Sequence, residues 1–130
     1  IYPALSPDSD TPSHRQFGGG DYGLGTAAMD YFWSQYLPDK SSAANPRAAP
    51  LLADLGGLPP VYLVSAGLDA LSDDANTLEQ KLEASQSPVM HRHYPGVIHG
   101  FFSMALFLDA AQQALTEAAA ALKEILAAPG

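Results

Sequence analysis

The sequence predicts an α/β domain in which a mostly parallel sheet is flanked by helices. Residues 61–66, Val-Tyr-Leu-Val-Ser-Ala, form an almost continuous apolar run, which is typical of a parallel strand buried on both faces. A helical pattern follows at residues 72–85, then a strand-like run at residues 89–94 and a last helical pattern at residues 108–126. This order of strand, helix, strand and helix favours parallel strands joined by right-handed crossovers.

Length and composition restrict the class of protein. The 130 residues are enough for one domain at most, and 47% hydrophobic against 15% charged residues indicate a chain that forms a core. The net charge of -8 argues against nucleic-acid partners and anionic membranes, which need a basic face. The lack of cysteine excludes disulfides, a thiol nucleophile and Cys-ligated metals, and no apolar run is long enough for a membrane span. The compartment stays open, and we favour the cytoplasm.

The segments before the first buried strand are mostly irregular. Residues 1–5 are predicted to be the end of a strand, and the turn-rich residues 6–12 a loop. The glycine-rich residues 18–25 predict a flexible loop over the site. Residues 38–60 are rich in Pro, Ser, Ala and Gly, so we expect irregular structure there, with one turn at residues 51–55.

Between these loops the sequence predicts one helix. Thr26 is suited to cap a helix that runs to about Leu37. One face of this helix carries large side chains at helical spacing: Met29, Phe32, Trp33 and Tyr36. Such a stripe is usually core packing. The alternative is a wall for an apolar acyl or alcohol group, because the segment follows a loop at the edge expected to carry the site.

The two helices of the C-terminal part have apolar stripes. In residues 72–85 the stripe comprises Ala75, Leu78 and Leu82, and Asp73 and Asp74 suit the positive end of the helix dipole. In the last helix the stripe comprises Leu108, Ala111, Leu115, Ala118, Leu122 and Ile125. Three strands are few for an open sheet, which usually has about four to six. We therefore expect that further strands of the sheet lie outside this chain.

Two residues with catalytic side chains follow the two later strands. Asp69 comes just after residues 61–66, and His99 lies in the loop after residues 89–94. The carboxyl ends of parallel strands form the edge where open α/β sheets place their sites. An Asp there can accept a hydrogen bond from one imidazole nitrogen, which leaves the other nitrogen available as a base. The alternative is that both are unpaired surface residues.

Two motifs resemble a known family. Residues 58–74, Leu-Pro-Pro-Val-Tyr-Leu-Val-Ser-Ala-Gly-Leu-Asp-Ala-Leu-Ser-Asp-Asp, and residues 94–101, Tyr-Pro-Gly-Val-Ile-His-Gly-Phe, resemble the C-terminal half of hormone-sensitive-lipase-like α/β-hydrolases. The similarity covers nearly the whole chain and implies that Asp69 is the triad acid and His99 the triad base. Ala70 stands where the family usually has Pro, and Ala can adopt the same backbone angles.

The family's nucleophile is missing from the sequence. Neither the elbow Gly-x-Ser-x-Gly nor the oxyanion segment His-Gly-Gly-Gly occurs, and no Gly stands two residues before Ser65. The chain order in α/β-hydrolases is Ser, then Asp, then His. We therefore expect residues 1–130 to be the C-terminal half of one catalytic domain, with an upstream half that supplies the serine and the oxyanion donors. Without them, the chain is expected to be inactive.

The resemblance implies a carboxylic ester hydrolase that works through an acyl-enzyme, with no cofactor and no metal. Its substrate would be a small-molecule ester, and a homodimer through residues 89–94 or the last helix is expected. The expected substrate-binding residues are Tyr22, Leu24, Val97, Ile98 and Phe101. Two alternatives stay open: a non-catalytic ligand-binding receptor with a broken triad, and a peptidase or amidase with the same Asp and His.

The remaining histidines have simpler interpretations. His91-x-His93 has the spacing of some zinc sites, but no carboxylate nearby in the sequence completes a ligand set. A polar outer face on an edge strand explains this pair better. His14 is expected to be an exposed loop residue.

Overall fold

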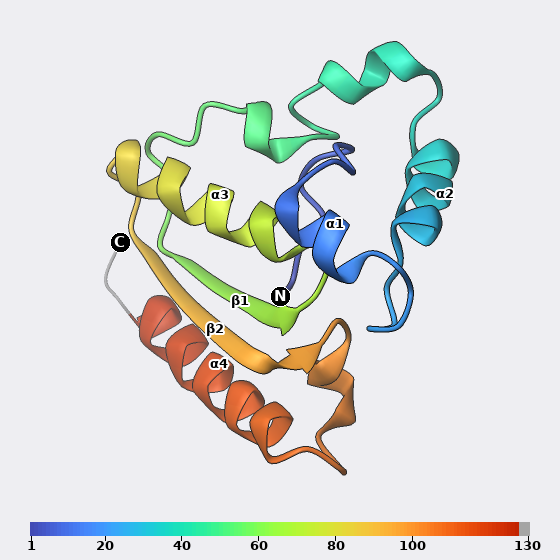
Figure 1. Ribbon diagram of the computed structural model, residues 1–130. Coiled ribbons are helices and arrows are strands. Elements are labelled where there is room, and N and C mark those ends of the chain that lie inside the picture. Colours follow the sequence, from blue (N-terminus) through green and yellow to red (C-terminus); the bar gives the residue numbers. More distant parts are fainter. Residues whose placement is uncertain (128–130) are drawn as a thin grey trace.

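Two parallel strands form the centre of the structure, a computed structural model that describes residues 1–127. β1 (Val61–Leu68) pairs with β2 (Val89–Ile98), and α3 (Ser72–Ala84) connects them. Figure 1 shows α3 on one face of this sheet and α4 (Asp109–Ala127) on the other. The expected α/β architecture, a parallel sheet flanked by helices, is confirmed.

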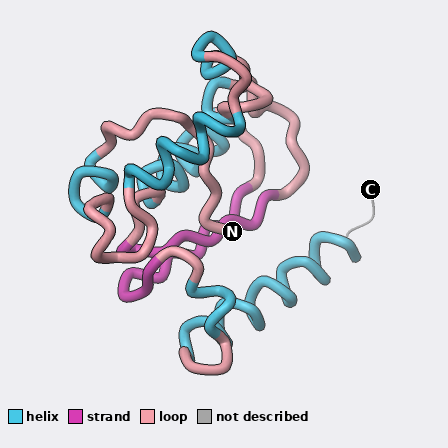
Figure 2. Tube along the Cα trace, turned by 90° about the vertical axis from the view of Figure 1, so that its right-hand side faces the viewer, coloured by secondary structure: helices cyan, strands magenta, loops and turns pink. Residues whose placement is uncertain are grey.

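The N-terminal half of the chain forms short helices on the α3 side of the sheet. Figure 2 shows α4 separated from these segments by the strands. The elements are α1 (Pro12–Phe17), α2 (Thr26–Tyr36) and the 3₁₀ turns η1 (Lys40–Ala44) and η2 (Pro50–Leu52); a third, η3 (Phe101–Met104), precedes α4. No helix within residues 1–127 combines the length and the apolar character needed to cross a bilayer.

Helix α1 was not predicted from the sequence. Its six residues are held by contacts to a distant part of the chain. Ser13 Oγ donates to the carbonyl of Ala70 at 2.6 Å, and the Ser13 amide donates to Asp73 at 2.8 Å. His14, expected to be exposed, is buried in this helix, and its Nδ1 lies 3.1 Å from Thr26 Oγ1. The sequence also predicted Thr26 as the cap of the next helix. In the structure Thr26 is the first residue of α2, and the cap is Gly25.

The first five residues do not form the expected strand. The Tyr2 amide donates to the carbonyl of Val64 at 2.6 Å, so the segment begins beside β1. The backbone of Tyr2 then leaves the extended region, with φ of 32°. A continuous ladder with β1 needs extended residues on both strands. This departure limits the pairing to a single hydrogen bond.

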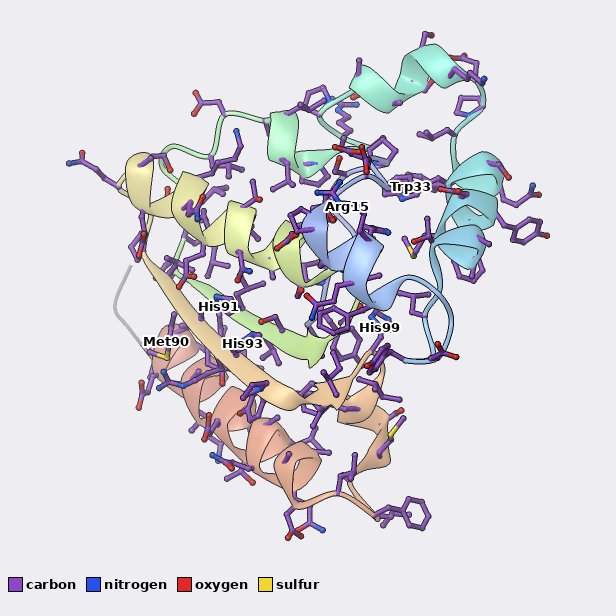
Figure 3. All side chains as sticks on the ribbon, viewed as in Figure 1. Arg15, Trp33, Met90, His91, His93 and His99 are labelled. Carbon is purple, nitrogen blue, oxygen red and sulfur yellow. The ribbon has the colours of Figure 1, made fainter. Side chains whose placement is uncertain are left out.

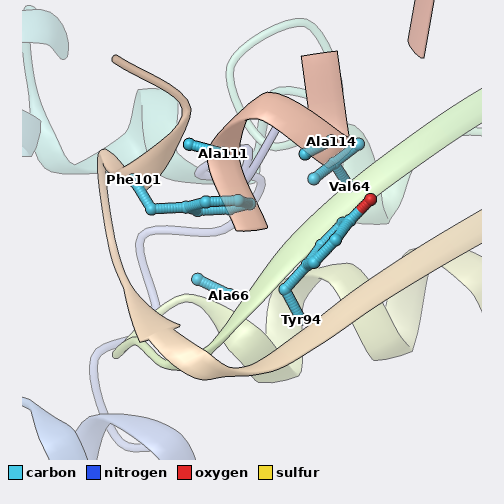
Figure 4. Close-up of a cluster of buried hydrophobic side chains, with 6 residues drawn as sticks. All are labelled: Val64, Ala66, Tyr94, Phe101, Ala111 and Ala114. Atoms are coloured by element: carbon cyan, nitrogen blue, oxygen red, sulfur yellow. The ribbon is translucent and has the colours of Figure 1, made fainter. Parts of the chain in front are cut away.

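A core of small and aromatic side chains joins the sheet to α4. Figure 4 shows this cluster, which consists of Val64, Ala66, Tyr94, Phe101, Ala111 and Ala114. The buried face of α4 is made of alanines, so the helix can pack close to the strands. The stripe expected for this helix is therefore only partly correct, because Ala111 is buried whereas Leu115 and Leu122 are exposed. In α3, Ala75 and Leu82 are buried as predicted.

Candidate active site

A bulge between the strands determines where the site residues lie. The pairing is regular from Val61 with Val89 to Ala66 with Tyr94, and then shifts so that Leu68 pairs with Ile98. The extra residues of β2 lie opposite Gly67, where a Cβ atom would come within 2.5 Å of the Pro95 backbone. Only glycine permits this close approach. β2 therefore continues past residue 94, where the sequence predicted its end.

Asp69 and His99 directly follow the last paired residues of the two strands. His99 Nδ1 donates a hydrogen bond to Asp69 Oδ2 at 2.8 Å, so the predicted contact is confirmed. The other carboxylate oxygen accepts from the Leu71 amide at 3.0 Å. The Asp69 side chain is 1% exposed and that of His99 is 26% exposed. Because a carboxylate only accepts, Nδ1 carries the proton and the lone pair remains on Nε2.

Aromatic rings and a turn hold the imidazole in place. The Tyr2 ring packs on His99 with ring centres 4.6 Å apart (His99 is labelled in Figure 3). Burial, and then the negative charge of Asp69, raise the pKa of Tyr2. Gly100 turns the chain with φ of 81°, a conformation that favours glycine, and Phe101 enters the core. The histidine therefore lies between a fixed strand end and an anchored turn.

An apolar cleft of about 560 Å³ opens beside His99. Its wall includes all four residues of the α2 stripe, which are Met29, Phe32, Trp33 and Tyr36. Figure 3 shows Trp33 on the side of α2 that faces the rest of the molecule. Met29 is buried, whereas Phe32 and Tyr36 are 55% and 65% exposed. Core packing therefore describes Met29 alone, and the exposed aromatic rings fit the alternative interpretation of a cleft wall.

The five expected substrate-binding residues lie in different parts of the structure, and most of them are away from the cleft. Leu24 lines the cleft beside His99. Tyr22 does not, and packs edge-on against Phe17 with ring centres 5.2 Å apart. Val97 packs against the core cluster, and Ile98 is half-buried at the strand end. Phe101 is fully buried in the core. Of the five, the structure brings only Leu24 to the cleft.

Two acidic residues of α3 bind the N-terminal segments that border the cleft. Asp74 accepts from the amides of Leu5 and Ser6 at 2.7 and 3.2 Å. Burial raises the pKa of Asp74, although these hydrogen bonds oppose the shift. Asp73 accepts from the Ser13 amide. Both were predicted only as helix-terminal charges, because the sequence does not show which distant amides face them.

A second polar cluster lies between α3 and the sheet. Ser65 Oγ is 2.7 Å from His91 Nε2 and 2.9 Å from His93 Nδ1, and His91 Nδ1 is 2.8 Å from Glu79 Oε2. The His91 side chain is 5% exposed, so the expected polar outer face is wrong for this residue. Within residues 1–127, no three His, Asp or Glu side chains are arranged to hold a metal ion.

The comparisons with known proteins agree with this geometry. The alpha/beta hydrolase fold family matches residues 1–103. An acetyl esterase of Salmonella typhi is 33% identical over 111 residues, which are 85% of this chain. A thermophilic, thermostable carboxylesterase cloned from a metagenomic library has a similar structure, with a TM-score of 0.94, 38% identity and 98% of this chain covered. An esterase from the archaeon Pyrobaculum calidifontis has a TM-score of 0.92, 32% identity and the same coverage.

These relatives are longer than this chain. The matched region spans 34% of the Salmonella enzyme and 44% and 43% of the two solved esterases. The family match, in contrast, covers most of this chain and includes both Asp69 and His99. The chain therefore belongs to the alpha/beta hydrolase fold family.

Proposed function

We propose that the protein carrying this chain is a carboxylic ester hydrolase in which Asp69 and His99 are the acid and the base of a Ser-Asp-His triad. The observation that carries the proposal is the 2.8 Å bond from His99 Nδ1 to the buried Asp69. It leaves Nε2 as the basic nitrogen of an imidazole that lines an apolar cleft. The esterases among the relatives support the same chemistry.

The reaction proceeds in two steps. A serine hydroxyl attacks the ester carbonyl while His99 Nε2 takes its proton, and the resulting imidazolium gives that proton to the departing alcohol as the C–O bond breaks. Water then attacks the acyl-enzyme, again with His99 as the base. Asp69 stays a carboxylate and stabilises the imidazolium. No cofactor takes part in these steps.

The serine belongs to a part of the protein outside these 130 residues. The chain contains no Gly-x-Ser-x-Gly segment, and Ser65 lies within β1 with 1% exposure. An ester carbonyl cannot reach such a hydroxyl. The backbone amides that stabilise the tetrahedral oxyanion would come from the same outside part.

The cleft favours small esters with an apolar group. Its wall is largely aliphatic and aromatic, and the names of the relatives point to acetyl and other carboxylic esters. Such a wall gains free energy by removing an acyl or alcohol group from water. Short acyl chains are therefore the first substrates to test.

The test uses the full-length protein and p-nitrophenyl acetate. His99→Ala is expected to abolish nearly all turnover without unfolding the protein, because its imidazole is the proton acceptor. Ser103→Ala is the control, since this exposed serine donates only to the carbonyl of Gly100. Near-normal turnover by the His99 variant would overturn the assignment.

A fluorophosphonate probe locates the nucleophile in the same protein. Peptide mapping by mass spectrometry is expected to find the label on a serine outside residues 1–130. A label on a serine within this chain would show that the nucleophile has been assigned to the wrong part of the protein.

We also propose a homodimer through β2 or α4. Within residues 1–127, β2 pairs only with β1, so its other edge carries backbone groups that can pair with another strand. α4 adds the exposed Leu115 and Leu122. Light scattering of the full-length protein at micromolar concentration should give the mass of a dimer, and a monomeric mass would reject the proposal.

A further inference from the structure

One arginine stands in the wall of the apolar cleft beside His99. Apart from His99 and Arg47, the residues that line this cleft are aliphatic or aromatic. No Asp, Glu or Lys of residues 1–127 contributes to the wall. A guanidinium is always charged and presents its N–H donors as a planar fork, which matches an anion with two oxygens. The proposed proton transfers do not use this group.

The loop that carries Arg47 is held by its own turn. It connects η1 to η2, and Asn45 Oδ1 accepts from the Arg47 amide at 2.9 Å. The Asn45 carbonyl accepts from the amides of Ala48 and Ala49 at 2.9 and 2.8 Å. Ala49 is fully buried, which anchors the loop to the domain, whereas Arg47 is exposed. The backbone therefore fixes the point from which the Arg47 side chain reaches the cleft.

No carboxylate in the described part of the chain neutralises Arg47. The other two arginines each have an acidic partner, because Arg15 contacts Asp10 and Arg92 contacts Glu117. The Arg47 guanidinium forms no hydrogen bond or ion pair with any side chain of residues 1–127. Its positive charge is therefore open to a ligand of the cleft.

The nearest acidic residues are engaged elsewhere. Asp39 and Asp54, the closest in sequence, accept hydrogen bonds from residues two or three positions further along the chain. Asp69 is 1% exposed and is bound to His99. None of these three carboxylates contributes to the wall of the cleft.

The surroundings of Arg47 define the chemistry of its ligand. A carboxylate can form two parallel hydrogen bonds with a guanidinium, and their attraction is stronger beside an apolar wall than in bulk water. The wall offers one permanent positive charge, which matches a carboxylate better than a doubly charged phosphate. The net charge of -8 repels anions from the protein as a whole, so a preference for an anionic ligand requires a local cation.

We propose that Arg47 binds a carboxylate of the substrate, so that the cleft takes esters in which the acyl or alcohol group is a short apolar chain ending in a carboxylate. This inference rests on the proposed ester hydrolysis and specifies its substrate class. The aliphatic and aromatic wall holds the chain, and Arg47 holds its charged end while the ester carbonyl faces His99. Arg47 acts in binding and takes no part in proton transfer.

Matched pairs of esters test the proposal with the full-length protein. Mono-p-nitrophenyl glutarate and p-nitrophenyl pentanoate have acyl chains of equal length that end in a carboxylate and a methyl group. The acetate ester of 4-hydroxybutyrate and butyl acetate make the same comparison on the alcohol side. For the anionic ester of at least one pair, Arg47→Gln is expected to lower kcat/KM about tenfold through KM, the lower end for a hydrogen bond to a charged group because Arg47 is exposed. The neutral esters should be turned over as before.

Two further variants separate the charge from its position. Arg47→Lys keeps the charge and should retain part of the activity on the anionic ester. Lys40→Gln removes a positive charge from the wall of a different cavity and should change neither member of a pair. Added salt should lower kcat/KM for the anionic ester in the wild type but not in Arg47→Gln. Equal effects of Arg47→Gln on anionic and neutral esters, no effect on either pair, or the same loss in Lys40→Gln would overturn the proposal.

Binding without turnover distinguishes this proposal from the proposed hydrolysis. In the full-length His99→Ala variant, NMR titration should show tighter binding of monomethyl glutarate than of methyl pentanoate. Adding Arg47→Gln to this variant should weaken binding of monomethyl glutarate about tenfold and leave methyl pentanoate unaffected. A wild-type protein that hydrolyses none of the esters would overturn the proposed function, whereas equal affinities of the two variants for monomethyl glutarate would overturn the role of Arg47.

Discussion

Asp69→Asn is the substitution for which the structure defines the chemical consequence most completely. One carboxylate oxygen of Asp69 accepts from the Leu71 amide at 3.0 Å, and the other accepts from His99 Nδ1 at 2.8 Å. In the variant, only the asparagine carbonyl oxygen can accept the hydrogen bond from the Leu71 amide, so the NH₂ group faces His99. Nδ1 must then be an acceptor, and the ring proton moves to Nε2. A protonated Nε2 cannot take the proton of a serine hydroxyl.

The expected loss follows from this change of tautomer. In the serine-protease triad, the same substitution lowers kcat by about 10⁴, which corresponds to ~5.5 kcal/mol of transition-state stabilisation at about 1.4 kcal/mol per factor of ten. We expect a loss of this order for full-length Asp69→Asn with p-nitrophenyl acetate. The free energy of unfolding should change much less, because the Leu71 amide keeps its acceptor.

Asp73→Asn is the matched control for this measurement. Asp73 accepts from the Ser13 amide, a role that an asparagine carbonyl can fill. We expect its activity to stay near normal, with a loss of stability of at most about 1 kcal/mol from the helix dipole. If Asp69→Asn lost less than about tenfold in kcat, or no more than Asp73→Asn, the orientation of His99 by Asp69 would not contribute to catalysis.

The remaining predictions concern the frame that supports the site, and urea unfolding of the full-length protein measures both. Gly67→Ala should lower the free energy of unfolding by about 1–3 kcal/mol, since its Cβ would overlap the Pro95 backbone. Gly19→Ala is the control and should have little effect, because the space around Gly19 is open. Equal effects of the two substitutions would contradict the close approach at Gly67. Leu82→Ala should cost about 2–5 kcal/mol because Leu82, on the inner face of α3, is fully buried, and the exposed Leu122→Ala should cost far less. A Leu82 variant as stable as the wild type would show that the packing of α3 does not depend on this side chain.

The parallel strands and the Asp69–His99 contact could be predicted because both depend on local and topological rules. A continuous apolar run indicates a buried strand, and parallel strands bring their carboxyl ends to one edge. The continuation of β2 to Ile98 could not be predicted, since it depends on a bulge opposite Gly67. Gly67 is a signal for a close backbone approach, but which residues of the other strand it faces depends on the pairing between the strands.

The segments that were predicted wrongly are those held by tertiary contacts. Helix α1 has only six residues, which is too short to be stable alone, and Ser13 anchors it to α3 and its preceding loop. His91 was assigned to an outer face because the sequence does not show that Glu79 of α3 lies 2.8 Å from it. A serine within an apolar strand and two histidines two residues apart were the available signals. They did not indicate that Ser65 bonds to both rings.

Because Leu68 pairs with Ile98, the distance between Asp69 and His99 does not depend on how many residues connect the two strands. Asp69 and His99 are 30 residues apart in sequence, yet each is one residue beyond a paired position of the ladder. Insertions or deletions in the loops of the crossover, at residues 85–88 for example, can be absorbed at the far end of the sheet. A single deletion within residues 95–97 would move His99 relative to its partner. Variation in length is thus tolerated in one part of the crossover and excluded from the other.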